Sequence, residues 1–217
     1  MNAKKNTFRY IFLVLVTFCA VALSACTADL TLELKKDGQI AVAFKGSAGP
    51  AFTKMIQAAT GNDSVVFETE EIAAELEKSG FINVNATSNN ADIQVSMVDA
   101  AQKTFIVNSG LVQTEKNDLS VILNAKNLYN FYSTADEQIV MILDLLIAPV
   151  FNDEQLEESE YLELLGSFYG DSIAQELSQS VLNLTVIGAD GAKKEQKIPL
   201  ATLLCLADQL VIHSSNL

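Results

Sequence analysis

Few side chains in this sequence are of a type that could act as a nucleophile, a base or a metal ligand. The 217 residues include one histidine, His213, and three cysteines, at positions 19, 26 and 205. A catalytic thiol needs a neighbouring base, but Cys205 lies in an apolar stretch and is typical of a small buried hydrophobic residue. A Cys205–His213 pair is the less favoured alternative. Phosphate loops, metal-binding motifs and hydrolase motifs are absent from the sequence, so we expect no catalytic residues, no metal and no cofactor.

Acidic side chains gather in two places, and both have the spacing of a solvated helix surface. Neither group has the alternating oxygen ligands and central glycine of a calcium loop. Paired carboxylates for glycoside hydrolysis stay open, because such pairs form in space and not in sequence. The two groups are Glu68, Glu70, Glu71 and Glu75, and Asp153, Glu154, Glu157, Glu158, Glu160 and Glu163.

Aromatic side chains concentrate in the second half of the chain. Core packing is the favoured interpretation, and a groove for a ligand or partner is the alternative. The residues are Tyr129, Phe131, Tyr132, Tyr161, Phe168 and Tyr169.

The one cysteine with a distinctive chemical setting is Cys26, at the end of an uncharged apolar run over residues 10–25. Lys4, Lys5 and Arg9 precede the run, and no acid occurs before Asp29. The run is shorter than the roughly 20 residues that cross a bilayer. A basic start, a short apolar middle and a small-residue exit are typical of a secretory signal peptide.

Leu23-Ser24-Ala25-Cys26 resembles the lipobox of bacterial lipoproteins. The resemblance implies that the Cys26 thiol receives a diacylglyceryl group and that a signal peptidase, recognising Leu23, Ser24 and Ala25, cuts before Cys26. Residues 1–25 would be removed, and residues 26–217 would be anchored by lipid on the non-cytoplasmic side of the cell envelope. Thr27, not Asp, follows Cys26. By the sorting pattern of this family, that implies the outer membrane if the organism has two membranes.

The negative net charge of the chain disfavours some classes of binding partner. The sequence has 27 acidic against 14 basic residues, a formal net charge of −13, and loss of the leader would remove basic residues only. A polyanion repels nucleic acids and anionic headgroups. We therefore expect no nucleic-acid partner, and attachment to the membrane through the lipid on Cys26 alone.

The first half of the mature chain shows alternating strands and amphipathic helices. Strands are expected at 29–36 and 39–45 around the turn Asp37-Gly38. A helix over 49–61 would place Phe52, Met55, Ile56 and Ala59 on one face, and a helix over 69–80 would have Thr69 as its cap. A hairpin is expected over 81–99, turning at Asn89-Asn90, and a short strand or turn over 103–110.

In the second half, a strand is expected at 118–124, a helix from 125, and a buried helix over 135–151 that stops near Pro149. Acidic helical pieces over 153–170 would turn Leu162, Leu165 and Phe168 inward. A helix over 171–180 would be capped by Asp171. A third hairpin over 181–200, turning at Asp190-Gly191, a helix over 200–208 and an edge strand over 209–214 would complete the chain.

Hairpins separated by helices predict an α+β fold with a mainly antiparallel sheet, packed by several helices in a single domain over residues 26–217. The favoured function is a non-catalytic binding or interaction module of the envelope, whose partner is an envelope protein or a small molecule. A structural or assembly factor of the envelope, and a carboxylate-based hydrolase, are the alternatives. A deep apolar pocket would favour a small molecule, and a shallow one with an exposed strand edge would favour a protein partner.

Overall fold

The computed structural model describes residues 27–60, 67–134, 140, 143–151 and 154–215. These residues form an α+β fold with a large six-stranded sheet and a small three-stranded sheet, as the hairpin pattern predicts. The leader, with Cys26 and the lipobox, lies outside the described residues.

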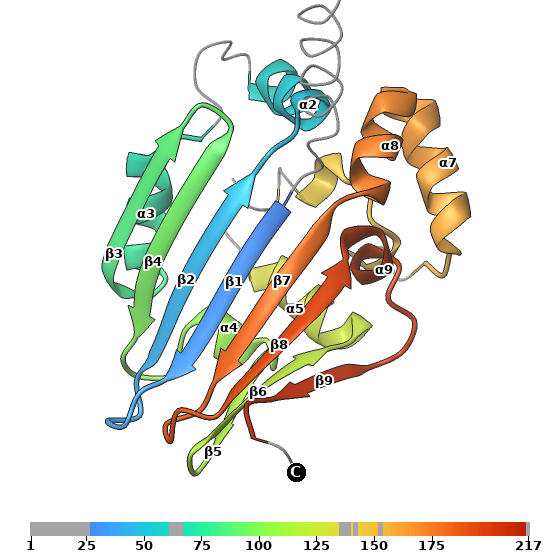
Figure 1. The fold of residues 1–217 in the computed structure, drawn as a ribbon. Coiled ribbons are helices and arrows are strands. Elements are labelled where there is room, and N and C mark those ends of the chain that lie inside the picture. Colours follow the sequence, from blue (N-terminus) through green and yellow to red (C-terminus); the bar gives the residue numbers. More distant parts are fainter. Residues whose placement is uncertain (1–26, 61–66, 135–139, 141–142, 152–153, 216–217) are drawn as a thin grey trace, which may run out of the picture.

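The large sheet has the strand order β3-β4-β2-β1-β7-β8. Its strands are β1 (Thr27–Leu34), β2 (Ile40–Ser47), β3 (Ile82–Asn89), β4 (Asp92–Asp99), β7 (Val181–Ile187) and β8 (Lys193–Pro199). Three antiparallel hairpins build it, and the pairing of β1 with β7, which joins the first hairpin to the third, is parallel. In Figure 1 the sheet runs across the front of the molecule.

All three predicted hairpins are confirmed. Gly38 and Gly191 adopt positive φ angles of 86° in the turns after β1 and β7, a conformation that glycine reaches without steric cost. The Asp37 carboxylate accepts the N–H of Gln39 and so supports the first turn. The turn after β3 centres on Asn90, at a φ of 54°.

The small sheet has the order β5-β6-β9, with β5 (Val112–Glu115), β6 (Asp118–Leu123) and β9 (Leu210–His213) all antiparallel. The predicted strand over 118–124 and the predicted edge strand near the C-terminus are therefore confirmed. β6 packs against β1 and β7, so the small sheet lies on the inner face of the large one.

Helices cover the rest of the inner side and the two flanks. They are α2 (Pro50–Thr60), α3 (Thr69–Lys78), α4 (Phe105–Asn108), α5 (Ala125–Thr134), η1 (Pro149–Phe151), α7 (Glu158–Tyr169), α8 (Asp171–Ser178) and α9 (Leu200–Leu204). Within the described residues, no helix combines the length and the apolar character needed to cross a membrane.

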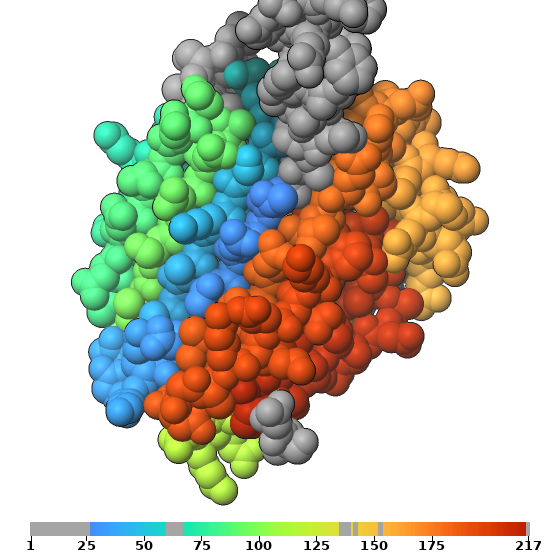
Figure 2. All heavy atoms as spheres, viewed as in Figure 1, coloured from blue at the N-terminus to red at the C-terminus, as the bar shows by residue number. Residues whose placement is uncertain are grey.

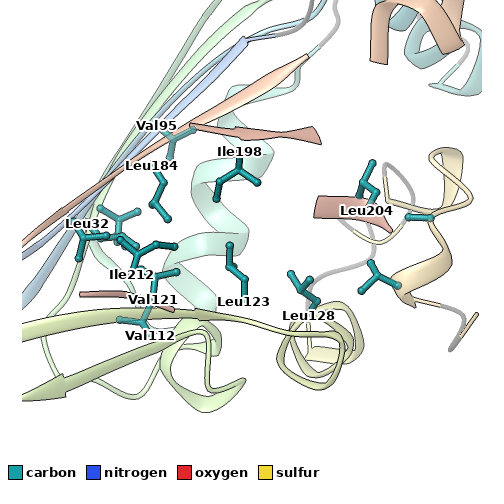
Figure 3. Packing of buried hydrophobic residues seen from close by; sticks show 14 of the residues in the cluster. Leu32, Val95, Val112, Val121, Leu123, Leu128, Leu184, Ile198, Leu204 and Ile212 are labelled. Carbon is teal, nitrogen blue, oxygen red and sulfur yellow. The ribbon is translucent and has the colours of Figure 1, made fainter. Parts of the chain in front are cut away.

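One hydrophobic cluster joins the two sheets and the helices. Leu32, Val95 and Leu184 from the large sheet meet Val121 and Ile212 from the small sheet (Figure 3). These residues are the inward half of each alternating strand pattern, which is why the period-2 pattern finds them.

Of the short strand or turn expected over 103–110, the structure shows a helical turn at residues 105–108. Other local expectations are wrong. Thr69 and Asp171 are the first helical residues of α3 and α8 and not their caps, because Glu68 and Gly170 hold the cap positions. Ala59 is exposed.

The expected helix over 135–151 lies partly outside the described residues. Its described part is helical at 143–145, turns at 146–147, and continues into η1 at Pro149. Leu143 and Leu146 are half-buried, not buried.

Candidate functional site

The structure brings together one set of side chains that resembles a catalytic triad in composition. Asp118 and Ser120 lie on β6, and His213 lies opposite Ser120 on the neighbouring strand β9. The Ser120 Oγ lies 2.8 Å from His213 Nδ1, and the same ring nitrogen lies 3.1 Å from Asp118 Oδ2. No sequence signal joined these residues, because 95 positions separate Asp118 from His213.

Hydrogen bonds hold the carboxylate of Asp118 in its ionised form. Burial by itself raises the pKa of Asp118, but the bonds from Ser214 Oγ (2.6 Å), the Ser215 N–H (2.9 Å) and His213 outweigh that effect. The pKa of Asp118 therefore lies well below its usual range. Since an ionised carboxylate only accepts, His213 carries its proton on Nδ1.

This arrangement cannot pass a proton from serine to histidine to aspartate. A catalytic triad uses the two ring nitrogens separately, one toward the nucleophile and one toward the carboxylate. Here Nδ1 faces both, and the Ser120 hydroxyl itself donates to Asp118 at 3.1 Å. The cluster instead fastens the C-terminal strand to β6, because Ser214 Oγ also accepts the Leu119 N–H at 3.0 Å.

Cys205 and His213 share no hydrogen bond among the described contacts. Burial and the nearby charges of Glu158 and Glu157 raise the pKa of the Cys205 thiol to about 11. The thiolate that a nucleophilic cysteine needs is therefore scarce at neutral pH.

The described members of the two acidic groups lie at or beside two separate helices, α3 and α7, and some of them support the local structure. Glu75 pairs with Lys78 on α3. Ahead of α7, the Glu160 carboxylate accepts the N–H of Glu157 at 3.2 Å and so caps the helix start. Asp153 lies outside the described residues. Among the described residues, no group of three or more His, Cys, Asp or Glu side chains could hold a metal ion.

The aromatic group divides between core and surface: Tyr161 is buried, three members are half-buried and two are exposed. Tyr161 is fully buried, and its hydroxyl donates to the Leu146 carbonyl at 2.7 Å. Tyr132 stacks on Phe151 with ring centroids 5.1 Å apart, and Phe131 contacts Phe105 edge-on.

Phe168 was expected to face inward but is 64% exposed. The inner face of α7 carries Tyr161 and Leu165 instead. Tyr129 on α5 is also exposed.

The outer face of the large sheet is the remaining candidate surface. Each strand turns one alternating set of side chains toward this face, away from the core cluster, and in Figure 2 side chains of β2, β1 and β7 lie at the surface of the molecule. We call this surface the open face. Its four inner strands contribute Gln94, Ser96 and Val98 (β4), Ala41, Ala43 and Lys45 (β2), Asp29, Thr31 and Glu33 (β1), and Asn183, Thr185 and Ile187 (β7).

The open face carries a shallow hollow at its centre. A hollow of about 220 Å³ lies over Thr31, Ala43 and Ser96, which is smaller than the roughly 300–1,000 Å³ of drug-sized ligand pockets. The hollow is lined by residues of β1, β2, β3 and β4, among them Glu33, Asn83 and Met97. A surface of this shape is better suited to a macromolecule than to an enclosed small molecule.

No family model matches this chain. Neither the curated proteins nor the solved structures include a match to it.

Proposed function

We propose that this chain is a lipid-anchored lipoprotein of the bacterial cell envelope and that its folded part is a non-catalytic interaction module. The observation that carries the proposal is Leu23-Ser24-Ala25-Cys26 directly after a basic start and an apolar run. Thr27, the residue after Cys26, already belongs to β1, so a cut before Cys26 would leave every described element of the fold in the mature chain.

The geometry of the reactive side chains supports a non-catalytic role. Asp118, Ser120 and His213 fasten two strands together. In the acidic groups, Glu160 caps the start of α7 and Glu75 forms an ion pair on α3. The hollow on the open face is smaller than a drug-sized ligand pocket, which supports recognition of a macromolecule over an enclosed small molecule.

Lipidation of Cys26 is tested by mass spectrometry of the chain purified from membranes. The expected N-terminus is Cys26 carrying acyl chains, and Cys26→Ser should abolish both the lipid and the cut before residue 26. Cys19→Ser and Cys205→Ser are matched controls, because they remove a thiol outside the lipobox and should leave the lipid in place. Wild-type chain without lipid in the soluble fraction would contradict the proposal.

A further inference from the structure

The open face carries far less net charge than the rest of the chain. Over all six strands it holds four carboxylates, Asp29, Glu33, Asp92 and Glu195, against three lysines, Lys45, Lys193 and Lys197. The whole chain has 27 acidic against 14 basic residues. Two copies of so acidic a chain repel each other over most approaches, and this face is a surface on which that repulsion is nearly absent.

The two edges of the large sheet are poorly suited to pairing with another strand. The edge strand β8 carries Lys193, Lys194 and Lys197 and ends at Pro199, and charged side chains and proline block edge pairing. At the other edge, the register of β3 is interrupted between Ile82 and Asn85, and such bulges also discourage pairing. If the large sheet takes part in association with another protein, its open face is therefore a more suitable contact surface than either edge.

We propose that the open face is the contact surface between two copies of this chain, related by a twofold axis close to the strand direction. Such a rotation reverses the strand order, so that β1 of one copy lies over β2 of the other and β4 lies over β7. Packed sheets of this kind cross at about 30°, which places the axis about 15° from the strands, and the facing residues therefore match most closely near the centre of the face.

Cross-strand register makes the face complementary to itself under this rotation. Asp29 of β1 and Lys45 of β2 lie at the same height, so each copy places its Asp29 opposite Lys45 of the other copy. Lys45 is exposed and has no ion pair within the described part of the chain.

The other positions also match by type. Val98 on β4 and Ile187 on β7 are level, because both align with the same row through Ala41 and Glu33. The rotation therefore places these two apolar side chains opposite each other. Ser96 on β4 and Thr185 on β7 are also level, since both align with Ala43 and Thr31. The rotation therefore places Ser96 of one copy opposite Thr185 of the other, and their small side chains allow the two sheets to approach closely.

The size of the face is sufficient for a weak specific dimer. Six strands about 4.8 Å apart and strands of about 25 Å give roughly 600 Å² per copy, or about 1,200 Å² in total, the low end of specific interfaces. If both copies are lipid-anchored, confinement to one membrane raises their effective concentration. The axis also places both Thr27 ends at the same end of the dimer, where both anchors could enter one bilayer.

The dimer is tested with the purified full chain in a non-denaturing detergent, by sedimentation over a concentration series up to about 100 µM, a range that covers weak interfaces. Ala43→Arg places a long charged side chain at the centre of the face and should weaken self-association at least tenfold. Ala58→Arg is the matched control, because Ala58 is exposed on α2, and it should leave association unchanged. Circular dichroism checks that both variants fold.

A charge exchange tests the pairing itself. Asp29→Lys or Lys45→Asp alone would place like charges opposite each other and weaken the dimer, and the double exchange should restore it. The same measurements on Cys26→Ser separate this proposal from lipidation, because the dimer should persist without lipid. A wild-type chain that stays monomeric throughout, or an Ala43→Arg variant that associates like wild type, would overturn the proposal.

Discussion

Asp118 illustrates at the residue scale how an aspartate beside a histidine and a serine can be structural. Its carboxylate accepts from Ser214, Ser215, His213 and Ser120. Hydrogen bonds to a charged group each contribute about 1.5–3 kcal/mol. The ionised carboxylate of Asp118 therefore links β6 to β9 and to the residues that follow β9.

Asp118→Asn should lower the free energy of unfolding by about 2 kcal/mol, since an amide accepts these bonds less well than a carboxylate. Urea denaturation measures the change. Asp208→Asn is the control, because Asp208 is exposed. Equal stability of the two variants would show that the cluster does not hold the fold.

The same residue predicts a pH dependence. The pKa of Asp118 in the folded chain is lowered, so the unfolded chain, with a pKa of about 3.9, binds the proton first as the pH falls. The contribution of Asp118 is therefore complete above about pH 5 and is lost progressively below about pH 4. Asp118→Asn should make the acid dependence of stability shallower, and an unchanged slope would contradict the assignment.

At the scale of single elements, helices and strands could be predicted where the sequence pattern that specifies them is local. Asp37-Gly38 and Asp190-Gly191 indicate their hairpins because the turn chemistry lies within a few residues. The parallel pairing of β1 with β7 was not predictable, because about 150 residues separate these strands and no short-range pattern encodes the contact. Phe168 was misplaced because helical periodicity alone does not say which of two apolar stripes meets the core.

Helix α2 shows a cap that sequence inspection cannot find. The Glu176 carboxylate, on α8 and only 8% exposed, accepts the N–H groups of Ala51 at 2.9 Å and Phe52 at 3.1 Å. Gly49 leaves the necessary space, since a Cβ there would collide with that carboxylate. A carboxylate at a helix N-terminus also interacts favourably with the helix dipole.

Glu176→Ala should therefore destabilise the chain by about 1–3 kcal/mol, because two buried N–H groups lose their acceptor. Glu163→Ala, at an exposed position of α7, is the matched control and should change stability by less than about 0.5 kcal/mol. Thermal and urea unfolding measure both. A similar small effect for both variants would show that water replaces the cap.

At the scale of the whole molecule, only part of the open face could be predicted from the sequence. The alternation of Thr31 and Glu33 with buried leucines indicates a solvent-facing side of β1. The open face as a whole could not be predicted, because it depends on the order of six strands from distant parts of the chain. The contact between Asp118 and His213 could not be predicted either, because it too joins strands from distant parts of the chain.

The position of β1 also predicts how an anchored chain would stand on the membrane. Thr27 is level with Ser47 on β2 and Val181 on β7, and Ser47 is level with Asp92 on β4. The turn at Asn90 therefore lies at the same end of the sheet as the proposed anchor. The turn at Asp37 lies at the other end, about 25 Å away for strands of eight residues.

In a Cys205→Ala background, a fluorophore attached at Asn90→Cys should be quenched strongly by quencher-labelled lipids in reconstituted vesicles. The same label at Asp37→Cys should be quenched weakly, because no linker separates Cys26 from β1 and the sheet cannot turn over freely. This expectation rests on lipidation of Cys26, which the mass measurement checks separately. Equal quenching at the two sites in a lipidated chain would show that the sheet does not stand upright on its anchor, and the two open faces would then have no fixed orientation in which to meet.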